Sequence, residues 1–184
     1  KRAAKRKKTG ETRKKEKAKA MIKDSRIFLG AVLALFLIHG CNSNVIHNET
    51  KDIPGSEWNK NHILSYNFKI EDTLQPYNVY LSVRNASKYQ FRNLYLFIET
   101  TSPRGNTVRD TFECMLADDR GRWYGKGWGD VYENKIPYKE YIRFPAKGTY
   151  GMKIEQAMRR SDLKHITDIG IVIEEAKIPD REQE

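Results

Sequence analysis

The chain contains very little cysteine. Its 184 residues include two, Cys41 and Cys114. If a modification consumes one of them, no intramolecular disulfide can form, even in an oxidising compartment where disulfides persist. We therefore expect a core that is held together by packing alone.

The chain also has no apolar run long enough to cross a membrane. The longest run, Ile27 to Ile38, has 12 residues, whereas a spanning helix needs roughly 20. It follows a short basic stretch and leads into Gly40 and Cys41. A basic start, an apolar segment and a small residue before the cleavage point are the parts of a secretory signal peptide. We predict that residues 21–40 are a signal peptide rather than a buried core helix.

The end of this segment resembles a bacterial lipobox. Its last residues read Ile-His-Gly-Cys and end at Cys41. In a lipobox the cysteine is acylated and becomes the first residue of the mature protein. We predict lipidation of Cys41.

Beyond residue 40 the chain has no excess of either charge. The formal net charge is +10, of which residues 1–20 contribute +9 and residues 21–40 contribute +1. The remaining chain, 41–184, is therefore neutral and lacks the positive field that attracts nucleic-acid phosphates. We expect no nucleic-acid partner for it.

The basic segment 1–20 begins with Lys1 and precedes the Met that opens the signal peptide. Positive charge in front of a signal peptide opposes translocation. We predict that this segment lies upstream of the true start. The alternative is a basic arm that binds RNA or anionic lipid.

Residues 41–184 have the usual length of one domain. Residues 41–60 are polar and show no sustained period, so we predict the lipidated cysteine followed by a tether. From 61 to 178 apolar residues alternate with polar ones, as in Leu64, Tyr66 and Phe68. This period of two indicates half-buried antiparallel strands. The predicted strands are 64–70, 79–84, 94–99, 107–112, 141–144, 149–156 and 168–174.

This spacing of strands is typical of a sandwich. We predict an all-β fold, an antiparallel β-sandwich that is jelly-roll-like or Ig-like. A short helical turn is expected near the C-terminus within 157–165, where Ser161 or Asp162 could cap the first amides. Residues 179–184 form a charged tail.

The longest predicted connection without a strand, 118–139, is rich in aromatic residues and glycine. It contains Trp123, Tyr124 and Trp128. Aromatic faces beside glycine turns can stack on sugar rings or bind a peptide, and long ordered loops often carry function. The alternative is that the tryptophans fold back over one end of the sandwich while the glycines permit tight turns.

Enzyme signatures are sparse. Ser161 and Lys164 match the S-x-x-K motif of penicillin-recognising enzymes, but the companion motifs S-D-N and K-T-G are missing. The histidines are too scattered to suggest a metal site. We predict no catalytic residue, no cofactor and no metal.

Several segments together resemble the gliding-motility-associated lipoprotein GldH family. They are Gly121 to Tyr132 (GRWYGKGWGDVY), Ile136 to Lys139 (IPYK), Phe144 to Tyr150 (FPAKGTY), Lys153 to Arg159 (KIEQAMR) and the pattern from Leu163 to Glu174. The resemblance covers about residues 22–177 and includes the signal peptide and the lipid-bearing Cys41.

The resemblance implies an envelope lipoprotein required for surface gliding. Its partners would be membrane lipid, through acylated Cys41, and other gliding-motility lipoproteins or envelope proteins linked to type IX secretion. It implies no catalytic residues. Lipoproteins that reach the cell surface often carry acidic residues after the cysteine, whereas Asn42, Ser43 and Asn44 are neutral, so we expect the periplasmic face of the outer membrane. A glycan-binding envelope lipoprotein that uses the aromatic loop is the alternative.

Overall fold

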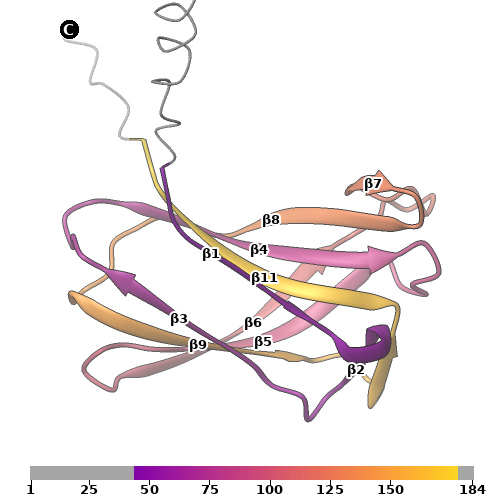
Figure 1. The fold of residues 1–184 in the computed structure, drawn as a ribbon, viewed down its shortest axis with the longest axis horizontal. Helices are drawn as coiled ribbons and strands as arrows, with labels where there is room; N and C mark the ends of the chain where they lie inside the picture. Colours follow the sequence, from indigo (N-terminus) through magenta and orange to yellow (C-terminus); the bar gives the residue numbers. More distant parts are fainter. Residues whose placement is uncertain (1–43, 178–184) are drawn as a thin grey trace, which may run out of the picture. The chain divides into compact units, whose positions relative to one another are not determined.

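The computed structural model describes residues 44–177 (Figure 1). The predictions for the basic segment 1–20, the signal peptide 21–40, Cys41 and the charged tail 179–184 lie outside the described residues. Among residues 44–177, no helix is long and apolar enough to cross a membrane.

The described chain is an antiparallel β-sandwich, as predicted. One sheet has the strand order β1-β11-β4-β8-β7 and the other has the order β3-β9-β5-β6. The first sheet contains β1 (Val45–Asp52), β4 (Tyr77–Ala86), β7 (Lys126–Trp128), β8 (Val131–Ile142) and β11 (Ile166–Glu175). The second contains β3 (Leu64–Ile70), β5 (Asn93–Thr101), β6 (Thr107–Met115) and β9 (Gly148–Gln156). A small third sheet pairs β2 (Glu57–Asn59) with β10 (Asp162–Lys164).

The connectivity is that of a jelly roll. When the eight long strands are counted along the chain, one sheet reads first, eighth, third, sixth, and the other reads second, seventh, fourth, fifth. A jelly roll has eight strands in two sheets. Of the two predicted sandwich types, the structure therefore has the jelly-roll type rather than the Ig type.

The core lies between the two sheets and follows the predicted alternation. In β3 the side chains of Leu64, Tyr66, Phe68 and Ile70 are buried, and the residues between them are exposed. The Tyr66 hydroxyl donates a hydrogen bond of 2.7 Å to the backbone oxygen of Ile169 in the opposite sheet. Since an unpaired buried hydroxyl is costly, this bond sets the two sheets in one relative position.

The predicted tether is wrong over most of its length. Residues 45–52 form β1, which pairs antiparallel with β11 from Val45↔Glu174 to Asp52↔Asp168. A 3₁₀ turn, η1 (Pro54–Ser56), and β2 follow directly. The sequence signal is weak because β1 is an edge strand whose side chains are only exposed or half-buried, so it needs no apolar face.

Two other segments also differ from the prediction. The expected helical turn within 157–165 is absent; part of it, 162–164, is the strand β10 instead. The expected loop 118–139 contains β7 and most of β8. Asn134 is the one buried residue in β8, so this strand lacks the alternation of buried apolar residues that marks strands such as β3.

The strands define two ends of the sandwich. We call the end at which β1 begins the proximal end; it also holds the connections 71–76, 102–106 and 143–147. We call the other end the distal end; there Ala86, at the end of β4, pairs with Val131, at the start of β8. In Figure 1 β7 and β2 lie at the distal end, on the right.

Gly170 provides a test of whether β1 is part of the folded domain. A Cβ atom at Gly170 would lie 2.6 Å from Oγ1 of Thr50 and 3.0 Å from the backbone oxygen of Glu49, both in β1. We expect Gly170→Ala to lower the free energy of unfolding by about 1–3 kcal/mol, because overpacking displaces β1. Thermal or urea denaturation measures the change.

Gly151→Ala is the matched control. A Cβ atom there has one neighbour, Oδ1 of Asn67 at an ordinary 3.7 Å. Stability should stay level or rise slightly, since alanine reduces the entropy of the unfolded chain. Equal effects of the two substitutions would contradict the close packing of β1 on β11.

Candidate functional site

The aromatic loop singled out from the sequence lies at the distal end of the sandwich. It runs from the end of β6 to the β7–β8 hairpin. Cys41 lies three residues before the first described residue, Asn44, which is at the proximal end. The aromatic loop is therefore at the opposite end of the domain from Asn44, and Cys41 itself lies outside the described residues.

The first half of the loop is held by backbone pairing and one carboxylate. Ala117 forms a bridge with Trp123. Oδ1 of Asp118 accepts hydrogen bonds from the backbone N–H groups of Arg120 (2.9 Å) and Arg122 (2.8 Å), and Oδ2 accepts one from Nε of Arg122 (2.7 Å). The backbone amide and then the guanidinium of Arg122 lower the pKa of Asp118. The loop is thus ordered.

The glycines of the second half have specific structural roles. A Cβ atom on Gly125 would lie 2.7 Å from the backbone oxygen of Glu133 and 2.9 Å from the side chain of Asn134. Gly129 has a φ of +62° in the two-residue turn between β7 and β8, a conformation that favours glycine. Gly125 therefore allows the chain before β7 to approach β8 closely, and Gly129 allows the tight turn between the two strands.

Trp123 packs inward rather than forming an open binding face. It is half-buried against the hydrophobic core. Its ring centroid lies 5.7 Å from that of Tyr132 and 6.4 Å from that of Tyr89, which is itself buried. Aromatic pairs at these separations stabilise a fold.

Tyr124 has a different environment from its neighbour. Its side chain is 62% exposed. The side chain of Trp128 lies outside what the structure describes, although its backbone pairs with Val131. Of the three predicted contact residues, Tyr124 is the one shown at the surface, while Trp123 contributes to the packing beneath it.

The ionisable groups buried in the domain serve structural contacts. Burial raises the pKa of the Cys114 thiol to about 12, so it is a poor nucleophile at neutral pH. Burial also raises the pKa of Asp168, whose Oδ1 lies 3.6 Å from Nε of Arg84. Within residues 44–177 no three His, Cys, Asp or Glu side chains are grouped to hold a metal ion.

The S-x-x-K match has no catalytic geometry. Lys164 belongs to β10 and its Nζ lies 3.9 Å from Oε1 of Glu57. In a strand, residues three apart point to opposite faces. Ser161 and Lys164 therefore lack the helical spacing through which such a lysine activates a serine.

The comparisons with known proteins identify the family. The model of the GldH lipoprotein family matches residues 45–173, which span all but the last residues of the described sandwich. The chain belongs to the GldH lipoprotein family. The gliding motility lipoprotein GldH homolog of Christiangramia forsetii is 32% identical over 152 residues, covering 79% of this chain and 93% of that protein. The gliding motility lipoprotein GldH of Flavobacterium johnsoniae is 35% identical over 161 residues, covering 84% of this chain and 98% of that protein.

Solved structures add little to this assignment. A family GH115 4-O-methyl-alpha-glucuronidase has a TM-score of 0.39 and 11% identity, over 72% of this chain and 18% of that one. Similarity at this level carries no argument about function.

Sequence reasoning missed part of the aromatic cluster at the distal end. Tyr89 and Phe91 pack edge to face with centroids 5.6 Å apart, and Tyr89 donates a hydrogen bond of 2.9 Å to the backbone oxygen of Asn93. They stand among polar residues in a connection that shows no period. Their proximity to Trp123 depends on the sheet pairing, which brings segments about 30 residues apart together.

Trp123 and Tyr124 should respond differently to truncation. Trp123→Ala is expected to lower the free energy of unfolding by about 2–4 kcal/mol, because it leaves a cavity beside Tyr89 and Tyr132. Tyr124→Ala should change it by less than about 0.5 kcal/mol, as is usual for an exposed side chain. Chemical denaturation followed by circular dichroism measures both values. A stable Trp123→Ala protein would mean that Trp123 does not pack as described.

Proposed function

We propose that the protein is a lipid-anchored, non-catalytic component of the gliding-motility machinery, linked to type IX protein secretion. The observation that carries this proposal is family membership over the whole described domain, together with two relatives named as gliding motility lipoproteins that the chain covers almost completely.

The anchor in this proposal is a set of acyl chains on Cys41. Lasting attachment to a membrane needs more than one chain. Three peptide units separate Cys41 from Asn44, and they span at most about 11 Å. The proximal end of the sandwich would therefore lie close to the membrane surface.

The distal end would then point away from the membrane. The long strands have up to 12 residues, and a strand rises about 3.3 Å per residue. The aromatic loop and Tyr124 would stand roughly 30 Å from the proximal end, within reach of other envelope proteins. This arrangement supports a docking role for the distal end.

We place the anchor in the outer membrane with the domain in the periplasm. No acidic residue follows the cysteine directly, since the next three residues are Asn42, Ser43 and Asn44. Lipoproteins that reach the cell surface, in contrast, often carry acidic residues there. A partner in the periplasm is consistent with a neutral domain that needs close contact rather than long-range attraction.

A non-catalytic role is supported by the environment of the groups that could do chemistry. The Cys114 thiol is fully buried. The Tyr138 hydroxyl, whose pKa is raised by burial and by the Asp110 carboxylate, donates a structural hydrogen bond of 2.6 Å to that carboxylate.

Deletion and complementation in the native host test the proposal. We expect deletion to abolish colony spreading and to alter the profile of secreted proteins, and a gene that begins at Met21 to restore both. Cys41→Ala should fail to restore either, because the protein leaves the membrane fraction. Cys114→Ala is the matched control and should restore both, since that thiol is buried and receives no lipid.

The outcomes separate the parts of the proposal. Normal spreading after deletion would contradict a role in motility. Lost spreading with an unchanged secreted profile would contradict the link to type IX secretion alone. Restoration by Cys41→Ala would contradict the anchor.

A further inference from the structure

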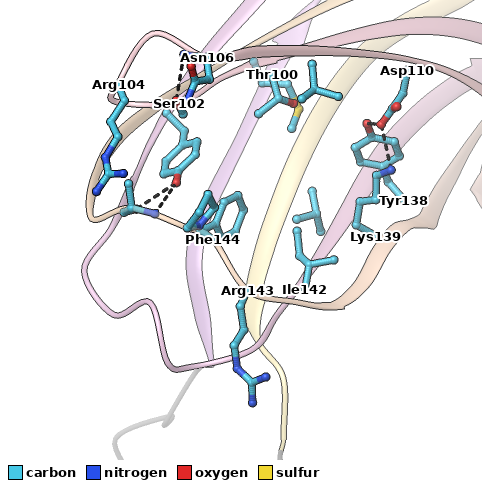
Figure 2. Close-up of a pocket in the computed structure, with 16 residues that line it drawn as sticks. Thr100, Ser102, Arg104, Asn106, Asp110, Tyr138, Lys139, Ile142, Arg143 and Phe144 are labelled. Carbon is cyan, nitrogen blue, oxygen red and sulfur yellow. Dashed lines mark hydrogen bonds and ion pairs between the residues drawn. The ribbon is translucent and has the colours of Figure 1, made fainter.

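The sandwich contains a cavity of about 430 Å³ between its two sheets at the proximal end. This volume falls in the range of roughly 300–1,000 Å³ that is typical of ligand pockets. Its walls come from both sheets: Val79, Tyr138 and Ile142 from one, and Thr100, Val108 and Met152 from the other. Phe144, which is labelled in Figure 2, lines the apolar interior. Tyr150 also belongs to this lining.

The cavity occupies space that the core would normally fill. One face of β6 carries Val108, Asp110, Phe112 and Cys114, which are spaced two residues apart, and this face points between the sheets. Cys114 is fully buried, whereas Val108 is 63% exposed. The inner face of β6 is therefore left uncovered towards the proximal end. Together with the cavity beside it, this uncovered face offers apolar surface to a ligand.

A polar clasp limits the cavity on one side. Asp110 of β6 accepts a hydrogen bond of 2.6 Å from Tyr138 of β8 and pairs with Nζ of Lys139 at 2.9 Å. Phe112 packs edge to face on Tyr138, with centroids 5.2 Å apart. These contacts join the edges of the two sheets, and they engage the one acidic group among the residues that line the cavity.

The rim of the cavity is positively charged. Arg104 from the 102–106 connection and Arg143 from the 143–147 connection lie at its edge and extend away from the Asp110 clasp (Figure 2). Nε of Arg143 donates a hydrogen bond of 2.8 Å to the backbone oxygen of Leu74. None of the ion pairs formed within residues 44–177 involves either arginine.

We propose that this cavity binds an acyl chain of a membrane lipid whose anionic headgroup pairs with Arg104 and Arg143. The inference rests on the proposed anchor at Cys41, which would hold the proximal end at the lipid surface. An apolar interior with a cationic rim fits an anionic amphiphile.

The surroundings of the rim favour a lipid over a soluble ligand. Leu74 is 78% exposed and Tyr141 is 58% exposed. Leu74 lies in the 71–76 connection and Tyr141 near the end of β8, both at the proximal end. Large exposed side chains of this type are suited to the boundary between lipid and water.

The neighbouring sheet edge disfavours a peptide that would add as a strand. Beyond its pairing with β7, β8 contains Pro137, which cannot donate a backbone hydrogen bond. The register between β4 and β8 shifts on both sides of Val79. Val79 pairs with Lys139, and the next residue, Tyr80, pairs with Pro137. Proline and irregular register both protect a sheet edge against strand addition.

Photo-crosslinking in cells of the native host tests the proposal. Cells that express the full chain are fed a fatty acid that carries a diazirine and an alkyne, which enters the membrane lipids. After ultraviolet exposure, the protein is isolated through its alkyne-tagged adducts and mapped by mass spectrometry. We expect label that depends on ultraviolet light in peptides that contain residues 104–110 and 138–146.

Two matched pairs of variants assign the label to the cavity. Val108→Trp fills the cavity and should reduce this label by about tenfold, whereas Thr111→Trp, an exposed residue of the same strand on its other face, should not. Arg104→Glu should reduce it several-fold, since it reverses a rim charge. Arg120→Glu, an exposed arginine at the distal end, should leave it unchanged.

The possible results are distinct. Label on the Cys41 peptide without ultraviolet light reports the anchor, so a missing anchor and a missing lipid site are read separately. An anchored protein with no light-dependent label in the two cavity peptides would overturn the proposal. Equal loss of label in Val108→Trp and Thr111→Trp would also overturn it. In a complementary experiment, a photoreactive amino acid replaces Val108. If it captures a polypeptide instead of a lipid, the proposal is likewise overturned.

Discussion

The burial of two apolar sheet faces against each other is the constraint on which the rest of this structure depends. The described chain has one free cysteine, Cys114, and it is buried. β11 is an inner strand of its sheet. Its residues from Ile169 to Ile173 are buried, and it pairs with β1 on one side and with β4 on the other. The Tyr66 hydroxyl, bonded to the backbone of Ile169, connects this strand to the opposite sheet. A close-packed core of this kind is sensitive to changes in the volume of the side chains between the two sheets, whereas substitutions on the outer faces have smaller effects.

The jelly-roll connectivity determines which functional features can cooperate. Each long strand runs the length of the sandwich, so a loop and a terminus either share an end or are separated by a whole strand. β1 begins at the proximal end, where the lipid-binding cavity also lies, and the aromatic loop closes the distal end. The lipid contact and the partner contact that we propose would therefore lie at opposite ends of the sandwich, and neither would obstruct the other.

The edge formed by β8 shows how one strand serves two purposes. At its start the β7 hairpin covers it, because Gly125 allows the backbone to approach Glu133 closely. At its other half no strand from residues 44–177 covers it, and Tyr138 instead forms the clasp with Asp110 of β6. The uncovered half borders the cavity. A sheet edge that is protected by proline and bulges can remain open without attracting another strand.

The sequence by itself determined the signal peptide prediction, the all-β class and the positions of most core strands, because a half-buried strand must alternate apolar and polar residues. It also contained the segments that identify the GldH family. It did not reveal β1 or β8, since an edge strand needs no apolar face, and the polar residues of β1 resemble a tether. Only the tertiary structure decided that Trp123 packs on Tyr89 and Tyr132 while Tyr124 remains exposed. The same holds for the cavity, whose walls come from strands far apart in the chain and meet only when the two sheets close on each other.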